Sequence, residues 1–207
     1  MDLQRMLIFI PGIIIGFTIH EYCHAFAAYK LGDTTAKDDG RLTFDPLKHI
    51  DVIGLIFIIF AGFGWAKPVQ FNPNRLKHPN RDKAIIAAAG PLSNLLLGIL
   101  LLFIIKGLYL LPIGDEKTIN TANSVMEVLY YWSFVNIGLF VFNMLPIPPL
   151  DGSHIFLSGL NINPDIENKI IKIGAGILFA ILIIQTQTDI TILPIGKIIN
   201  AIISLIL

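Results

Sequence analysis

The chain has 207 residues, of which 54% are hydrophobic and only 14% are charged, and its mean hydropathy is +0.71. A soluble domain carries about 25% charged residues, so this composition argues against a soluble fold and indicates an integral membrane protein in a lipid bilayer. The 15 basic and 15 acidic residues cancel, which excludes the basic surface typical of nucleic-acid-binding proteins, so we expect no nucleic-acid partner.

The first apolar stretch, residues 6–29, has the length of a membrane-spanning helix, which needs about 20 mostly apolar residues. Three polar residues interrupt it near its C-terminal end: His20, Glu21 and His24. Charged side chains inside a membrane helix cost about 2.5–3.5 kcal/mol each on insertion scales, so they indicate a functional site. The alternative is a helix end whose polar residues simply meet lipid headgroups.

The next apolar segment, residues 52–63, is too short to cross a membrane. It leads into Gly64-Trp65-Ala66-Lys67-Pro68-Val69. We therefore predict a short re-entrant or β-hairpin element near residues 50–71. An extended strand at residues 60–71 would offer its edge to an unwound peptide substrate; the alternative is a packed structural loop.

The remaining apolar stretches complete a helical bundle. Residues 84–111, 125–148 and 168–187 are long enough to span, while residues 190–207 span, pack against the bundle or lie at the interface. We predict an all-α polytopic membrane protein with about 4–6 transmembrane helices. It forms a single domain over residues 1–207, with a catalytic core at about 6–155 and C-terminal helices at about 166–207.

The distribution of basic residues predicts the orientation of the bundle. Residues 30–49 contain four basic residues and residues 66–83 contain five, but residues 112–124 contain one. The positive-inside rule places both basic segments in the cytoplasm. The first helix then ends at the cytoplasmic side, and the natural location is the inner membrane of a prokaryotic cell.

The sequence His20-Glu21-Tyr22-Cys23-His24 is an H-E-x-x-H motif. Residues i and i+4 of a helix share one face, so the two imidazoles are able to bind one metal ion. Zn²⁺ suits imidazole ligands, and the adjacent glutamate is placed to act as general base in hydrolysis. The motif thus predicts a one-zinc metalloprotease.

A catalytic zinc normally has three protein ligands, so a third is required. Asp151 follows three prolines within four residues, which break the preceding helix at the same expected depth as His24. An Asp-Gly pair is also a common turn signal, so the position of Asp151 alone leaves its role open. His154 is the rival ligand, whereas His49 and His78 lie in basic loops and are expected to be solvated.

Three motifs together resemble the site-2 protease family of intramembrane metalloproteases. They are H-E-Y-C-H at 20–24, G-P-L-S-N at 90–94 and N-x-x-P-x-P-P-L-D-G at 143–152, while G-W-A-K-P-V at 64–69 resembles the compact branch without PDZ or CBS domains. The resemblance implies zinc held by His20, His24 and Asp151, with Glu21 as catalytic base. It also implies cleavage of a transmembrane protein substrate in or near its membrane helix, close to the cytoplasmic side.

Two asparagines in apolar helical stretches are further candidates. Asn143 and Asn94 each carry an amide that is able to stabilise an oxyanion or hold the substrate backbone. The alternative for both is an interhelical hydrogen bond, which is common in membrane bundles.

Two other functional classes remain open. Intramembrane His, Glu and Asp residues also build ion pathways, so a membrane metal or ion transporter is one alternative. A zinc-binding membrane protein without catalysis is the other, although the intact Glu21 argues against it.

Overall fold

The computed structural model describes residues 3–111, 114–160, 162–188 and 190–207, and across these ranges the regular structure is helical. The prediction of an all-α protein is therefore confirmed. In chain order the elements are α1 (Leu3–Lys30), α2 (Thr35–Asp38), α3 (Pro46–His49), α4 (Val52–Ala61), the 3-10 helix η1 (Pro73–Arg75), α5 (Pro79–Tyr109), α6 (Glu116–Asn143), α7 (Asp151–Ser158), α8 (Pro164–Gln187) and α9 (Ile195–Ser204).

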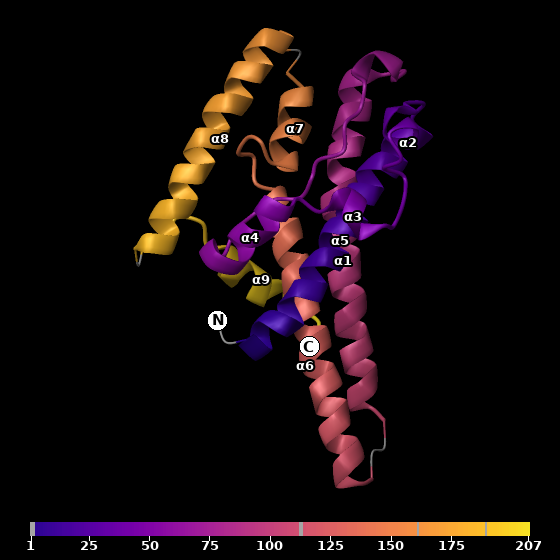
Figure 1. Cartoon of the computed structure of the whole chain (residues 1–207), viewed down its shortest axis with the longest axis vertical. Helices are drawn as coiled ribbons and strands as arrows, with labels where there is room; N and C mark the ends of the chain where they lie inside the picture. The colour runs from indigo at the N-terminus through magenta and orange to yellow at the C-terminus, as the bar shows by residue number, and fades with distance from the viewer. Residues whose placement is uncertain (1–2, 112–113, 161, 189) are drawn as a thin grey trace.

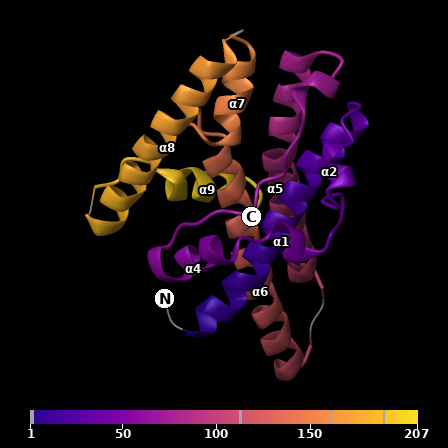
Figure 2. The ribbon, with the colours of Figure 1, turned by 45° about the horizontal axis from the view of Figure 1, so that its top comes forward.

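Four helices, α1, α5, α6 and α8, are long and apolar enough to cross a membrane. They overlap the four spans predicted from the sequence, and the chain is a multi-pass integral membrane protein. In Figure 1, α1 rises from the N-terminus, α5 descends, α6 rises and α8 descends, as successive membrane crossings require. The same alternation is visible after the rotation in Figure 2.

The core lies between α5 and α6, which pack against each other and against α1. The short helix α9 adds two buried isoleucines, Ile199 and Ile203, to the apolar cluster formed by Leu102 of α5 and Ile137 of α6. Because α9 has only 10 residues, it is too short to span a bilayer. Of the three possibilities for the C-terminal stretch, packing against the bundle is the one observed.

Helix α6 begins and ends earlier than the predicted range 125–148. It begins at Glu116 because the carboxylate of Asp115 accepts the backbone N–H of Thr118 at 2.9 Å, an N-cap that the hydropathy pattern did not include. It ends at Asn143 because prolines follow, and a proline cannot donate the backbone hydrogen bond that would continue a helix. The irregular segment that results leads directly into α7.

The segment near residues 50–71 is a short helix followed by an extended return. Asp51 caps α4 by accepting the N–H of Gly54, and Gly62 ends the helix in a left-handed conformation at φ 75°. The β-hairpin alternative is wrong, because the described residues contain one isolated bridge, between Ile50 and Ala66. The ten-residue helix fits the re-entrant alternative, since it is too short to cross.

Two glycines allow the chain to double back closely over α4. A Cβ atom at Gly64 would lie 2.0 Å from the carbonyl oxygen of Gly54, a distance that no side chain tolerates. The close approach of these two backbones sets where the extended residues after Gly64 run. They run from α4 toward the N-terminal end of α5 (Figure 1).

Helix α8 packs loosely on the rest of the bundle. In its hydrophobic 18-residue stretch only 11% of the residues are buried, against 39% in the corresponding stretch of α5. Its contacts include an ion pair between Lys83 and Glu167, with Nζ and Oε2 3.6 Å apart, and an edge contact between the rings of Phe63 and Phe179. The exposed apolar face of α8 is suited to lipid.

Candidate metal centre

The two motif histidines lie one turn apart on α1 and face the interior of the bundle. His20 and His24 are 5% and 9% exposed, and their Nε2 atoms are 3.0 Å apart. The uninterrupted helix from Leu3 to Lys30 produces this arrangement, because its i and i+4 side chains share one face. The spacing predicted from the sequence is therefore the spacing observed.

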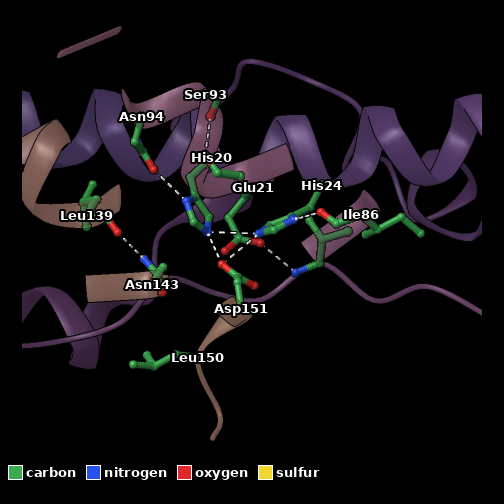
Figure 3. A network of polar contacts seen from close by, with 12 residues as sticks. His20, Glu21, His24, Ile86, Ser93, Asn94, Leu139, Asn143, Leu150 and Asp151 are labelled. Atoms are coloured by element: carbon green, nitrogen blue, oxygen red, sulfur yellow. Dashed lines mark hydrogen bonds and ion pairs between the residues drawn. The ribbon is translucent and has the colours of Figure 1, made fainter. Parts of the chain in front are cut away.

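Helix α5 fixes the orientation of both imidazole rings. His20 Nδ1 contacts Asn94 Oδ1 at 2.6 Å, and His24 Nδ1 contacts the carbonyl oxygen of Ile86 at 2.7 Å. Oxygen atoms accept, so both Nδ1 atoms carry the proton and both Nε2 atoms present a lone pair. Figure 3 shows the two Nε2 atoms turned toward each other and toward Asp151.

Asp151 is the first residue of α7 and enters the site from the proline-rich turn. Its Oδ2 lies 3.1 Å from His20 Nε2 and 3.4 Å from His24 Nε2. The following Gly152 permits this approach, because a Cβ atom there would lie 2.4 Å from the carbonyl oxygen of Met144. The broken helix thus returns tightly enough to bring a carboxylate to the histidine pair.

These three side chains have the donor geometry of a zinc site. Among the described residues, His20, His24 and Asp151 form the group whose potential ligand atoms lie within 4.8 Å of one another. Zn–N and Zn–O bonds of about 2.0–2.2 Å in a tetrahedron separate ligand atoms by roughly 3.3 Å, close to the 3.0–3.4 Å found. A divalent cation between them would accept both imidazole lone pairs and balance the charge of the carboxylate.

His154, the rival ligand, lies in the wall of the same cleft but does not join this cluster. It is one turn beyond Asp151 on α7. The geometry therefore favours Asp151, and the assignment of the ligand remains a prediction that metal analysis tests.

Glu21 lies beside the cluster and is 6% exposed. Its Oε2 accepts the backbone N–H of Val69 at 2.8 Å, so the extended segment after α4 reaches the side chain expected to act as base. The cleft around these residues has a volume of about 670 Å³ and is bounded by α1, α5, α6, α7, α8 and residues 64–71. An extended peptide segment has room to enter it.

The two candidate asparagines have different positions. Asn143 lines the cleft, where its Nδ2 donates to the carbonyl oxygen of Leu139 at 3.0 Å. Asn94 is fully buried, and its Nδ2 donates to the carbonyl oxygen of Gly16 and to Asn136 Oδ1. Because all its polar atoms are engaged, Asn94 is placed to orient His20, while Asn143 lies in the cleft wall.

His49 does not have the solvated position expected from its basic loop. It is fully buried on α3, and its Nε2 contacts the carbonyl oxygen of Thr43 at 2.8 Å. Burial lowers the pKa of the imidazole, so the side chain is held neutral. A contact between α3 and α1 across the intervening loop produces this burial, and hydropathy of the loop did not indicate it. His78 is exposed, as expected.

Gly90 contributes to the site through its missing side chain. The Gly90-Pro91 pair lies in the interior of α5, which begins at Pro79. A Cβ atom at Gly90 would lie 2.4 Å from His24 Nε2 and 2.8 Å from His20 Nε2. The glycine thus leaves open the space between the two ligand atoms.

We expect Gly90→Ala to lower zinc affinity strongly, because the added methyl group enters the space that a metal ion between the two histidines requires. The measurement is zinc content of the purified protein after dialysis against a buffered chelator. Gly107→Ala is the matched control, since it lies on the same helix and a Cβ atom there meets nothing within 4 Å. Equal zinc content in Gly90→Ala and the control would contradict the prediction.

Comparison with known proteins agrees with this geometry. The sequence profile of peptidase family M50 matches residues 8–185. Three relatives carry the name "Putative zinc metalloprotease": YwhC of Bacillus subtilis, Rip2 of Mycolicibacterium smegmatis and MJ0611 of Methanocaldococcus jannaschii. Their identities to the chain are 40%, 30% and 31%, over 74%, 70% and 72% of its length.

The coverage of these relatives differs. The match spans 69% of YwhC and 71% of MJ0611 but 54% of Rip2, so the chain accounts for about half of the mycobacterial protein. No solved structure gives a significant match to the chain.

Proposed function

The chain belongs to peptidase family M50 and is a zinc metalloprotease, and from this premise we propose that it hydrolyses a peptide bond in or near a transmembrane helix of a membrane-protein substrate. The observation that carries the proposal is the position of Glu21. Its carboxylate lies beside three converging ligand side chains, in a cleft among helices long enough to span a membrane. Hydrolysis near the cytoplasmic side, in the inner membrane of a prokaryotic cell, is part of the same proposal.

The ligand residues hold and orient the metal centre. His20, His24 and Asp151 would bind one Zn²⁺, which polarises the scissile carbonyl and makes water a better nucleophile near neutral pH. Asn94 and the carbonyl of Ile86 hold the two rings with Nε2 toward the ion. Such supporting contacts typically contribute about 10–100-fold to metal affinity or activity.

Glu21 moves the proton. Its Oε2 is occupied by the Val69 N–H, which leaves Oε1 to accept a proton from the attacking water. As the new C–O bond forms and the C–N bond breaks, Glu21 returns that proton to the departing amine. Asn143 lines the cleft, where its amide donates to the negative charge that develops on the carbonyl oxygen.

The test is proteolysis in a reconstituted membrane. The full chain is placed in lipid vesicles with a panel of single-span reporters that release a fluorophore on cleavage. We expect zinc-dependent cleavage of at least one reporter, abolished by a zinc chelator and restored by added zinc. If the chain is a transporter or a zinc-binding protein without catalysis, no reporter is cleaved. Zinc or proton flux across the same vesicles without cleavage would establish the transporter instead.

A further inference from the structure

Residues 67–72 are called the strap below, and residues 68–71 of it line the cleft beside Glu21. At one end the N–H of Lys67 donates to the carbonyl oxygen of His49 at 2.8 Å, and the carbonyl of Lys67 accepts from Arg41 Nη2. In the middle, the N–H of Val69 reaches Glu21. Since Arg41 is only 8% exposed and His49 is fully buried, this end of the strap is held by groups that are themselves fixed.

Asp33 holds the other end of the strap. It is fully buried just after α1, and its Oδ2 accepts the N–H of Asn72 at 2.6 Å. Its Oδ1 accepts the N–H and the hydroxyl of Thr35 at 3.0 and 2.6 Å. An ionised carboxylate is able to accept all three bonds at once.

The surroundings of Asp33 favour its ionised form. Burial by itself raises the pKa of the carboxyl, but hydrogen bonds from Thr35 and Asn72, with the charge of Arg75, lower it below its usual value. Arg75 Nη1 lies 3.8 Å from Oδ1. A charged, fully hydrogen-bonded anchor is costly to disrupt, so the end of the strap at Asn72 stays in place.

We propose that Asp33 is a positioning residue for catalysis, which acts through the strap to hold the carboxylate of Glu21. The proposal rests on the proposed proteolytic function. Glu21 lies in the C-terminal half of α1 and Asp33 follows the end of that helix. The strap closes a loop between them, because Asp33 accepts the N–H of Asn72 and Glu21 accepts the N–H of Val69. The loop fixes the distance between anchor and base.

The chemical consequence concerns the rotation of Glu21. A glutamate side chain has several rotatable bonds, and a hydrogen bond from a fixed N–H to Oε2 selects the rotamer that leaves Oε1 toward the cleft. When the strap is released, the carboxylate samples other rotamers. A displacement of about 1 Å at a reacting group is enough to cost on the order of 10²-fold in rate.

The test compares Asp33→Asn with Asp38→Asn in the zinc-loaded full chain. The amide introduced by Asp33→Asn has the shape of the carboxylate but one acceptor oxygen fewer, so the bond to Asn72 or those to Thr35 must break. Asp38 is an exposed carboxylate that contacts the same Arg75, at 3.5 Å, and accepts the hydroxyl of Thr34 rather than a group of the strap. Hydrogen exchange of a peptide covering residues 67–72, zinc content, kcat and KM on a cleaved reporter are measured for both.

We expect Asp33→Asn to accelerate exchange in the strap and to lower kcat by roughly 10–100-fold, while KM and zinc content stay near wild-type values. Asp38→Asn should change none of the four. Unchanged exchange would show that Asp33 does not anchor the strap. Faster exchange with unchanged kcat would show that the strap does not position Glu21. Either result overturns the proposal.

Val69→Pro is the second variant, in case Asp33→Asn loses zinc or fails to fold. It removes the N–H that donates to Glu21 Oε2 and does not alter the groups that bond to Asp33. A similar loss of kcat with zinc retained supports the proposal, and wild-type kcat overturns it. Failure of the wild-type chain to cleave any reporter is a different outcome, because it removes the proposed function itself.

Discussion

Replacing Glu21 by glutamine is expected to lower the rate of cleavage by about 10²–10⁴-fold, the usual contribution of a general base, while zinc remains bound. Glutamine has the same shape and its amide oxygen still accepts the N–H of Val69, so the strap and the fold keep their contacts. What is lost is the ability to take and return a proton. The measurement is kcat on a single-span reporter together with zinc content.

The control for this variant is Glu127→Gln, an exposed glutamate on α6 outside the residues that line the cleft. It should retain wild-type kcat and zinc. Cleavage by Glu21→Gln at the wild-type rate would remove Glu21 from the mechanism. Loss of zinc along with activity would instead mean that Glu21 supports the metal centre. We do not expect this result, because Glu21 Oε2 is engaged with the Val69 N–H.

The long helices were predictable because a membrane-spanning helix is encoded by one uninterrupted run of apolar residues. Residues 6–29 and 84–111 lie within α1 and α5 apart from a few end residues, since about 20 consecutive apolar residues allow few other structures in a bilayer. Helix ends were less predictable. The start of α6 depends on one side chain, Asp115, bonding one backbone N–H, and hydropathy averages over such a contact.

The segment near residues 50–71 was ambiguous for a related reason. A run of about ten apolar residues is compatible with a short helix or a strand. Two local features set the limits of the helix that forms: the N-cap at Asp51 begins it and the left-handed Gly62 ends it. The close contact of Gly54 with Gly64 then placed the extended residues, and this contact pairs positions that no local pattern connects.

The residues of the site also differ in how far the sequence predicts them. His20, Glu21 and His24 could be predicted as neighbours because their spacing within one helix sets their geometry. Asp151 was predicted from the proline-broken helix and the family resemblance, and the structure places its carboxylate beside the histidine pair. The Val69 N–H and the Ile86 carbonyl were missed, because backbone groups have no sequence signature and their positions follow from how separate elements pack. Asp33 was not singled out because, in the sequence, an aspartate in a loop cannot be told from an ordinary turn residue. Its burial and hydrogen bonds are visible only in the structure.

The second large effect concerns the third ligand. We expect Asp151→Ala to lower zinc affinity by more than the roughly 10–100-fold typical of residues that only support a ligand. Removing the carboxylate leaves two neutral imidazoles, with Nε2 atoms 3.0 Å apart, to hold a divalent cation in a buried site. Zinc content after dialysis against a buffered chelator measures the effect, and Asp151→Asn separates the loss of charge from the loss of an oxygen ligand.

Thermal unfolding provides an independent measurement of the same prediction. A ligand that binds only the folded state raises the unfolding temperature in proportion to the logarithm of its concentration over Kd. Added zinc should therefore stabilise the wild-type chain and His154→Ala, but not Asp151→Ala. His154 is the matched control because it lies one turn further along α7, in the wall of the same cleft. If zinc stabilises Asp151→Ala and fails to stabilise His154→Ala, the third ligand is His154, and α7 must turn in the zinc-bound protein to bring that ring to the histidine pair.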